Sequence, residues 1–371
     1  MRIAMTPPLY TIGADGAGGV GNSVALLTKH LSSRGHDVDV YTVATSRLPA
    51  GTKVDVFAEG IIELGRTPAD AWAWDAAGMH KAAKMIARER YDIVHNNCCS
   101  YTGFLELSPL PHCLTTIRIP ADWSGGFPSA RIAFEIDPSI KKGAFVAVSD
   151  NQRRAYAGVN FLATVHNGIE LDGFHFNDDA DDYVAWLGRL ETTKGLDHAA
   201  AACQRTGTPF RFAGSKRDPT VYELALELAK KKDVEFLGYA NPEARDALLG
   251  RARALLTPSR WEEPFGYVNI ESMACGTPVI AYDLGANREV IEHGVTGFLV
   301  PPGDQDGFAA ALQNVMSMPA AEYRAMRRAC RERVEKLFTV DRVVDDYERL
   351  YAQVLGRPAP APRAGSAALE R

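Results

Sequence analysis

The feature that most constrains the fold of this chain is a regular alternation of short apolar runs with longer amphipathic segments along most of its 371 residues. Runs rich in β-branched residues that alternate with helical segments are typical of βα units around parallel sheets. In the first half, residues 23–33 and 69–90 have helical periodicity. The strand candidates there are 2–6, 38–42, 92–95, 113–117, 145–149 and 162–165.

The alternation is interrupted at an acidic, poorly periodic stretch, 176–182. A second series of strand candidates follows at 183–187, 210–213, 234–237, 254–257, 279–281 and 297–300, and residues 320–354 have a helical pattern throughout. We therefore predict an α/β chain with two Rossmann-like parallel-sheet domains. The expected divisions are an N-terminal domain 1–170, a C-terminal domain 171–340, a helix 341–356 and a disordered tail 357–371.

Charge and composition exclude several classes of partner. The net charge of −5 at pH 7 leaves no basic field of the kind that nucleic-acid binding requires. The six cysteines have no CxxC spacing, and we interpret them as reduced thiols. The N-terminal segment lacks the apolar core of a secretory signal, and no apolar run of about 18 residues follows. We expect a cytoplasmic protein without nucleic acid as a partner and without evident membrane association.

Ligands of open parallel sheets bind outside the carboxyl ends of the strands, so the segments after strands are the candidate sites. The first such segment, 13–21, is rich in glycine and precedes a helix expected to begin near Asn22. Its GxGxxG spacing is separated from the strand by residues 7–15, and no acid ends the second strand, so a dinucleotide fingerprint is poorly matched. The alternatives are a structural loop and a loop, including Gly18 and Gly19, that contacts phosphate or acceptor.

The second segment, 188–195, carries two cations after the first strand of the second series. Arg189 offers a planar fork and Lys194 a point charge, and together they could clamp a diphosphate next to a helix start. The alternative is an ordinary solvated loop.

The third segment, 261–280, contains two carboxylates at a defined spacing. Glu263 lies in a loop after a strand, Phe265 and Gly266 open a helix, and Glu271 falls about a turn and a half into it. Both carboxylates can then face one pocket, where each accepts a pair of hydrogen bonds from vicinal hydroxyls of a sugar or a ribose. The alternative is a helix-start carboxylate and a solvated one.

These segments together resemble family 4 of the retaining glycosyltransferases, which have the GT-B fold. The matching motifs are the pair Glu263 and Glu271 with E-x7-E spacing, the cations in GRLETTKG, and the glycines in GAGGVG. HNGIELDGF and EVIEHGVTGFLV match as well, and the resemblance extends to about Val354. It implies two domains that face each other across a cleft, with C-terminal helices that return to the first domain.

The resemblance also implies residue roles, each carried over to its matching position. Arg189 and Lys194 would bind the diphosphate of a nucleotide-sugar donor. Glu263 with the backbone of Phe265 and Gly266 would hold the transferred sugar, and Glu271 would hold the ribose.

Three further positions and the mechanism follow from the same resemblance. Gly18 and Gly19 would lie against the diphosphate, and Tyr239 beside the nucleobase. The sugar would be transferred with retention, the departing diphosphate oxygen would take the proton of the acceptor, and protein cations would stabilise the charge. No metal and no cofactor beyond the nucleotide-sugar co-substrate are expected.

One position departs from the family pattern. Many relatives carry a histidine where this chain has Arg118, and a guanidinium cannot act as a general base. Arg118 then binds an anionic group, or pairs with Asp122 or another acid, or stands at a position that tolerates change. His95 ends another strand of the first domain, and it is either an acceptor contact or a structural histidine.

We therefore predict a retaining, metal-independent glycosyltransferase that moves a hexose-type sugar from a nucleoside diphosphate donor, expected to be a UDP-sugar, to a small-molecule or glycan acceptor. Glu263, Arg189, Lys194 and Arg118 are the catalytic candidates. The alternatives are a sugar-nucleotide epimerase of the same fold and an inactive sugar-nucleotide-binding partner. The acceptor side is assigned to first-domain loops at 43–70 and 122–137, whose sequence does not identify the acceptor, and the oligomeric state is left open.

Overall fold

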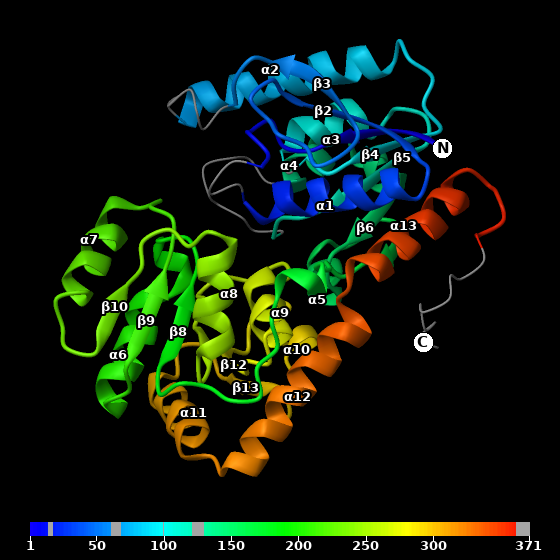
Figure 1. The fold of residues 1–371 in the computed structure, drawn as a ribbon. Coiled ribbons are helices and arrows are strands. Elements are labelled where there is room, and N and C mark those ends of the chain that lie inside the picture. Colours follow the sequence, from blue (N-terminus) through cyan, green and yellow to red (C-terminus); the bar gives the residue numbers. More distant parts are fainter. Residues whose placement is uncertain (14–17, 61–67, 99, 121–129, 361–371) are drawn as a thin grey trace. The chain divides into compact units, whose positions relative to one another are not determined.

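The computed structural model describes residues 1–13, 18–60, 68–98, 100–120 and 130–360. They form two compact units, one from Met1–Gly168 together with the chain from Val340 onward, the other from Ile169–Thr339. Figure 1 labels their elements. Each unit is built around its own parallel sheet, as the alternation in the sequence predicts.

In the described part of the first unit, seven parallel strands have the order β3-β2-β1-β4-β5-β6-β7. Ile3 of the central strand β1 pairs with Val38 on one side and with Ile93 on the other, and all three side chains are buried. Helices cover both faces, as is usual for a parallel sheet. The strands are β1 (Arg2–Thr6), β2 (Asp37–Val43), β3 (Thr52–Phe57), β4 (Ile93–Asn96), β5 (Cys113–Ile117), β6 (Ala144–Ala147) and β7 (Phe161–Thr164).

The helices of the first unit include one from the end of the chain. α13 (Val340–Val354) packs beside α1 (Gly19–Ser33), and its buried side chains join the core of the first sheet. An ion cluster ties the two together, because Arg34 Nη1 contacts Asp345 at 2.5 Å and Glu348 at 2.8 Å. The other helices are α2 (Pro68–Ile86), α3 (Tyr101–Leu107), α4 (Ala130–Ile136), the 3-10 helix η1 (Pro138–Lys142) and α5 (Asp150–Ala155).

The second unit repeats the architecture. Among its described residues, six parallel strands have the order β10-β9-β8-β11-β12-β13. They are β8 (Val184–Leu187), β9 (Phe210–Ala213), β10 (Val234–Phe236), β11 (Leu255–Thr257), β12 (Val279–Tyr282) and β13 (Gly297–Val300). The helices are η2 (Leu171–Gly173), η3 (Thr192–Lys194), α6 (Leu196–Thr206), α7 (Pro219–Leu228), α8 (Pro242–Arg251), α9 (Tyr267–Ala274), α10 (Asn287–Val290), α11 (Gln305–Ser317) and α12 (Ala320–Leu337). The predicted class, two Rossmann-like parallel-sheet domains, is confirmed.

Two local expectations were wrong. The segment 43–70, expected to be a loop, contains the edge strand β3, whose outer half is exposed and therefore lacks a strong apolar signal. The helix expected near Asn22 begins at Gly19, because the Tyr10 hydroxyl accepts a hydrogen bond from the Gly21 amide at 3.0 Å and supports the first turn. The helical pattern of 320–354 consists of the two helices α12 and α13, and Phe338 between them is fully buried against Phe265.

Candidate functional site

A cluster of charged and aromatic side chains lies in the second unit, in the segments that follow β8 and β11. The ammonium group of Lys194 forms an ion pair with the carboxylate of Glu263. Trp261 Nε1 donates to the same Glu263 oxygen at 2.8 Å, and Lys194 Nζ lies 4.8 Å from the centre of a Trp261 ring. The side chains of Lys194 and Glu263 are 17% and 19% exposed, so the pair is accessible from one side only.

The backbone around Lys194 is fixed by close packing. Gly195 follows it with φ of 69°, and a Cβ at this position would lie 2.1 Å from the carbonyl oxygen of Pro258. Only glycine allows both this conformation and this approach. Arg260 donates to the carbonyl oxygen of Thr192 at 3.1 Å through Nε and pairs with Asp197 at 3.0 Å. The two post-strand segments are thus joined through their backbones, which sets the position of Lys194.

Opposing influences set the ionisation of Glu263. Burial raises the pKa of its carboxyl group, but the charge and hydrogen bond of Lys194, the indole N–H of Trp261 and the charge of Arg189 together outweigh burial. The pKa of Glu263 is therefore below its ordinary value, and the side chain is a carboxylate at neutral pH. It can accept hydrogen bonds from hydroxyl groups while its position is held by Lys194 and Trp261.

Glu271 has a different partner. It lies on α9, which begins after Gly266, a residue with φ of 88°. Arg245 Nη1 of α8 donates to Glu271 Oε1 at 2.9 Å, and the guanidinium group of Arg245 lies 4.7 Å from the ring centre of Phe174. Burial raises the pKa of Glu271 and Arg245 opposes the rise, with a net shift upward. The structure thus places the E-x7-E carboxylates on a loop and a helix of one unit, each with its own cation.

The remaining donor-side candidates of the second unit differ in exposure. Arg189 is 43% exposed at its side chain and pairs with Glu191 at 2.8 Å. Tyr239, in the segment after β10, is 48% exposed. Phe265 is 2% exposed and packs edge-on against Phe338, so its side chain belongs to the core.

In the first unit, Gly18 is the N-cap residue of α1, Gly19 is its first residue, and the preceding residues 14–17 lie outside the described part. His95 has no exposed surface, and its two ring nitrogens lie 2.7 Å from the Tyr351 hydroxyl and 2.8 Å from Thr116 Oγ1. Burial, followed by the charge of Arg118, lowers its pKa well below the ordinary value. His95 therefore fits the structural alternative and not the acceptor contact.

Arg118 is 8% exposed and follows β5 directly. Its Nε donates to Asn97 Oδ1 at 2.9 Å, and its Nη1 donates to Asn167 Oδ1 at 2.8 Å. The anticipated pairing with Asp122 lies outside the described residues. The contacts that are described are with neutral amide oxygens and not with an acid.

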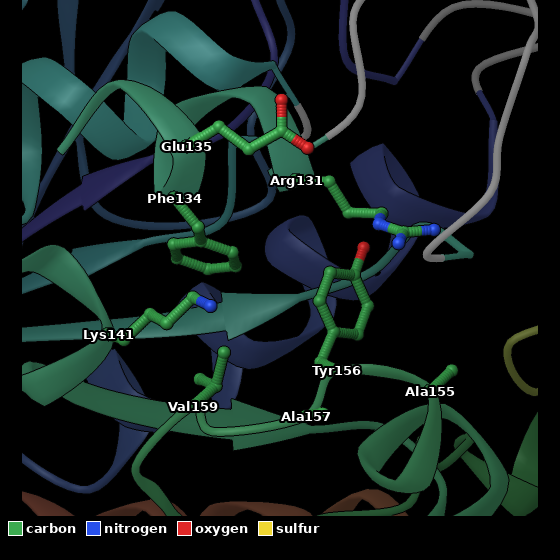
Figure 2. Close-up of a pocket in the computed structure, with 8 residues that line it drawn as sticks. All are labelled: Arg131, Phe134, Glu135, Lys141, Ala155, Tyr156, Ala157 and Val159. Carbon is green, nitrogen blue, oxygen red and sulfur yellow. The ribbon is translucent and has the colours of Figure 1, made fainter. Parts of the chain in front are cut away.

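A separate pocket in the first unit is formed by α4, η1 and the chain around the end of α5. Figure 2 shows the rings of Phe134 and Tyr156 and the ammonium group of Lys141 around it. Lys141 Nζ lies 5.9 Å from the centre of the Phe134 ring. Part of this pocket comes from the 122–137 segment that the sequence assigns to the acceptor side, and none of the predicted site residues lines it. The full lining is Arg131, Phe134, Glu135, Lys141, Ala155, Tyr156, Ala157 and Val159.

Several residues of the site were missed by the sequence reasoning. Trp261 stands two residues before Glu263. An aromatic residue so close to a motif carboxylate could have been predicted to contact it. Arg245 and Asn97 had no local signal, because only the tertiary fold brings them to Glu271 and Arg118. Asn167 lies in the matched HNGIELDGF motif, but nothing in that motif indicates that it contacts Arg118.

The described residues contain neither a metal-binding cluster nor a membrane-spanning helix. No group of three or more His, Cys, Asp or Glu side chains there is arranged to hold a metal ion. None of the helices in the described ranges is long and apolar enough to cross a membrane.

Comparison with solved structures identifies the fold class. Sucrose-phosphate synthase from Thermosynechococcus elongatus superposes with a TM-score of 0.80 at 22% identity, over 96% of this chain and 99% of that one. The Anabaena protein HepE, in complex with UDP and glucose, superposes with a TM-score of 0.73 at 16% identity, over 96% and 99% of the two chains. The two parallel-sheet units are thus those of the GT-B fold.

Family models and curated relatives define the family. The model described as Glycosyl transferases group 1 matches residues 170–336, and the model described as Glycosyltransferase Family 4 matches residues 17–173. Glycogen synthase from Mycobacterium tuberculosis is 28% identical over 98% of this chain and 97% of its own length. D-inositol 3-phosphate glycosyltransferase from Mycobacterium avium is 29% identical over 87% and 86% of the two lengths. The chain belongs to family 4 of the glycosyltransferases, and it is a glycosyltransferase enzyme.

Proposed function

We propose that this enzyme transfers a hexose-type sugar, with retention and without a metal ion, from a UDP-sugar to a small-molecule or glycan acceptor. The observation that carries the proposal is the Lys194–Glu263 pair, held by Trp261 and placed after two neighbouring strands of the second unit. Complexes of the structural neighbour HepE with UDP and with UDP-glucose support the choice of donor.

In this proposal the second unit binds the donor. Lys194 and the exposed Arg189 contact the diphosphate, and Glu263, a carboxylate at neutral pH, accepts hydrogen bonds from the sugar hydroxyls together with the Phe265–Gly266 backbone. Glu271 accepts from the ribose hydroxyls. The positions of Tyr239 beside the base and of Gly18 and Gly19 against the diphosphate are carried over from the family pattern.

The chemical step then needs no protein base. The bond between the anomeric carbon and the diphosphate oxygen breaks, and a bond to the acceptor oxygen forms on the same face of the sugar. The acceptor proton passes to the departing diphosphate oxygen. Lys194 and Arg189 stabilise the negative charge that develops on that group. Arg118, in the first unit, is assigned to the acceptor side.

The first test is binding. In a thermal-shift assay with UDP, GDP, ADP and TDP, we expect UDP to raise the Tm most. A ligand at about a hundred times its Kd stabilises the protein by about 2.7 kcal/mol, which is enough to detect. Lys194→Met is expected to lose most of this shift. Lys230→Met, a matched charge removal at an exposed position after α7, is expected to keep it. Stabilisation by none of the four nucleotides would refute the donor assignment.

The second test is turnover. Glu263→Gln and Lys194→Met are each expected to lower transfer at least about a hundredfold, because each acts on orientation or on transition-state charge. Proton NMR of the product reports whether the anomeric configuration is retained. A new sugar nucleotide formed without any acceptor would instead identify an epimerase, and nucleotide binding without transfer or hydrolysis would identify an inactive partner. Activity that is abolished by EDTA and restored by a divalent cation would refute metal independence.

A further inference from the structure

The first unit contains a buried cation, Arg118, that has no acidic partner among the residues the structure describes. Asn97 and Asn167 accept hydrogen bonds from its side chain through amide oxygens, at 2.9 and 2.8 Å. Amide oxygens are neutral. They fix the direction of the guanidinium group but leave its full charge in place, and a buried charge that is not compensated is costly.

The titratable side chains around Arg118 do not supply the missing charge either. Burial, together with Arg118 itself, lowers the pKa of His95 well below its ordinary value, so the ring is neutral. Burial raises the pKa of Tyr347, whose hydroxyl interacts with Arg118, and it raises the pKa of Tyr351. Both phenols are therefore protonated at neutral pH. The surroundings of Arg118 that the structure describes are polar and uncharged.

Two other buried arginines show how this chain normally satisfies such a group. Arg34 has three carboxylate partners, Asp345, Glu348 and Asp341, at 2.5, 2.8 and 3.3 Å. Arg327 has no exposed surface and uses all three of its nitrogens as donors. Its acceptors are the carbonyl oxygens of Asn177, Gly250, Ala252 and Cys275 and the hydroxyls of Thr277 and Tyr323. Among the described residues, Arg118 has neither neutralising carboxylates nor such a complete set of acceptors.

The location of Arg118 points to a ligand. Asn97 follows β4, Arg118 follows β5 and Asn167 follows β7, all at the carboxyl edge of the first sheet. This is the edge at which open parallel sheets bind their ligands. A guanidinium group presents a planar fork of N–H donors that matches the two oxygens of a carboxylate or a phosphate. The two asparagines bond Nε and Nη1 and so fix the orientation of the guanidinium group.

We infer that Arg118 receives an oxyanion, a carboxylate or phosphate, carried by the acceptor that the first unit binds. This inference rests on the proposed function for its assignment of the acceptor to the first unit. It makes Arg118 a determinant of acceptor specificity, since a neutral acceptor would leave the buried guanidinium uncompensated. It also accounts for the presence of an arginine at a position where a general base is not needed.

The test uses inorganic phosphate and acetate as probes, each compared with chloride at equal ionic strength by thermal shift of the full chain. One of the two anions is expected to stabilise the wild type more than chloride does, and which one does so distinguishes phosphate from carboxylate. In Arg118→Gln the apparent affinity for that anion is expected to fall about tenfold or more, as for a lost hydrogen bond to a charged group. Arg90→Gln, which removes an exposed charge just before β4, is expected to stay within about twofold of the wild type.

Arg118→Lys serves where the glutamine variant does not fold, because it keeps the charge and removes the fork. It is expected to bind the anion more weakly than Arg90→Gln does. An equal response of the Arg118 and Arg90 variants, or no anion effect in the wild type beyond that of chloride, would overturn the inference.

A parallel titration with UDP separates this inference from the proposed function. UDP is expected to stabilise the wild type and Arg118→Gln alike, because the proposed donor contacts lie in the second unit. If UDP stabilises neither protein while the anion effect at Arg118 persists, the donor assignment fails and the oxyanion site stands. If Arg118→Gln loses the UDP shift, the oxyanion is the donor diphosphate, and the assignment to the acceptor is overturned.

Discussion

Gly195 and Gly207 flank the same helix, and comparing them isolates the cost of close packing behind Lys194. Both have positive φ, 69° and 67°, before and after α6. A Cβ on Gly195 would lie 2.1 Å from the carbonyl oxygen of Pro258, whereas a Cβ on Gly207 would meet no atom within 4 Å. Replacing each by alanine therefore imposes the same backbone strain but only one steric overlap.

The magnitudes follow from these two terms. Left-handed backbone costs an alanine about 1 kcal/mol, partly offset by the lower entropy of the unfolded chain. Overlap with a backbone carbonyl adds about 1–3 kcal/mol, because main chain must move. At about 2–4 °C per kcal/mol for a unit of this size, Gly195→Ala is expected to lower Tm by roughly 4–16 °C and Gly207→Ala by no more than about 4 °C.

Calorimetry or circular dichroism would measure both Tm values. A nucleotide titration of each variant would show whether the overlap also disturbs Lys194, and we expect weaker UDP binding only for Gly195→Ala. Equal decreases in Tm for the two variants would refute the reasoning, because they would mean that backbone strain alone accounts for the cost.

Two further predictions concern buried charges. Because Lys194 and its neighbours keep the pKa of Glu263 low, the stability that this ionisation contributes is present above the unfolded-state pKa and is lost as pH falls through the folded-state pKa. In Lys194→Met the effect of burial on Glu263 is no longer opposed by the lysine, so the pKa of Glu263 rises. The Tm difference between this variant and the wild type should therefore be larger at pH 7 than at pH 4. A difference that does not change with pH would contradict this. Arg34→Met removes the guanidinium group that pairs with the buried carboxylates Asp345 and Glu348, while His36 keeps its contact with Glu348 at 2.8 Å. Urea unfolding is expected to show a loss of about 3–5 kcal/mol, whereas a loss below about 1 kcal/mol would show that the cluster is not tightly coupled.

The sheets could be predicted because their strands are buried on both faces and appear as continuous apolar runs. The run at Cys113–Ile117 is fully buried and coincides with β5. The strand that was missed, β3, lies at the edge, and three of its first four residues are polar. Between α12 and α13, Phe338 packs against Phe265, a residue more than seventy positions earlier, and no periodicity within the segment encodes that contact.

In the candidate site too, some residues could be predicted from the sequence and others could not. Arg189, Lys194, Glu263 and Glu271 could be proposed from the sequence because each stands next to a strand end or a helix start and within a recognisable motif. Their partners were not found. The contact between Arg245 and Glu271 joins α8 to α9, and helix periodicity does not specify which polar residues of neighbouring helices meet.

Arg118 shows why the acceptor side is harder to derive than the donor side. The donor contacts proposed here come from segments in which a charged side chain stands beside a glycine that marks a turn, such as Lys194 followed by Gly195. Arg118 is a single charged residue after a strand, and the sequence alone allows it to be paired, tolerated or used. The tertiary contacts add what the sequence lacks, since among the described residues Arg118 has two amide acceptors and a neutral histidine nearby, and no carboxylate. The oxyanion preference inferred for the first unit therefore rests on the folded surroundings of one side chain rather than on any motif.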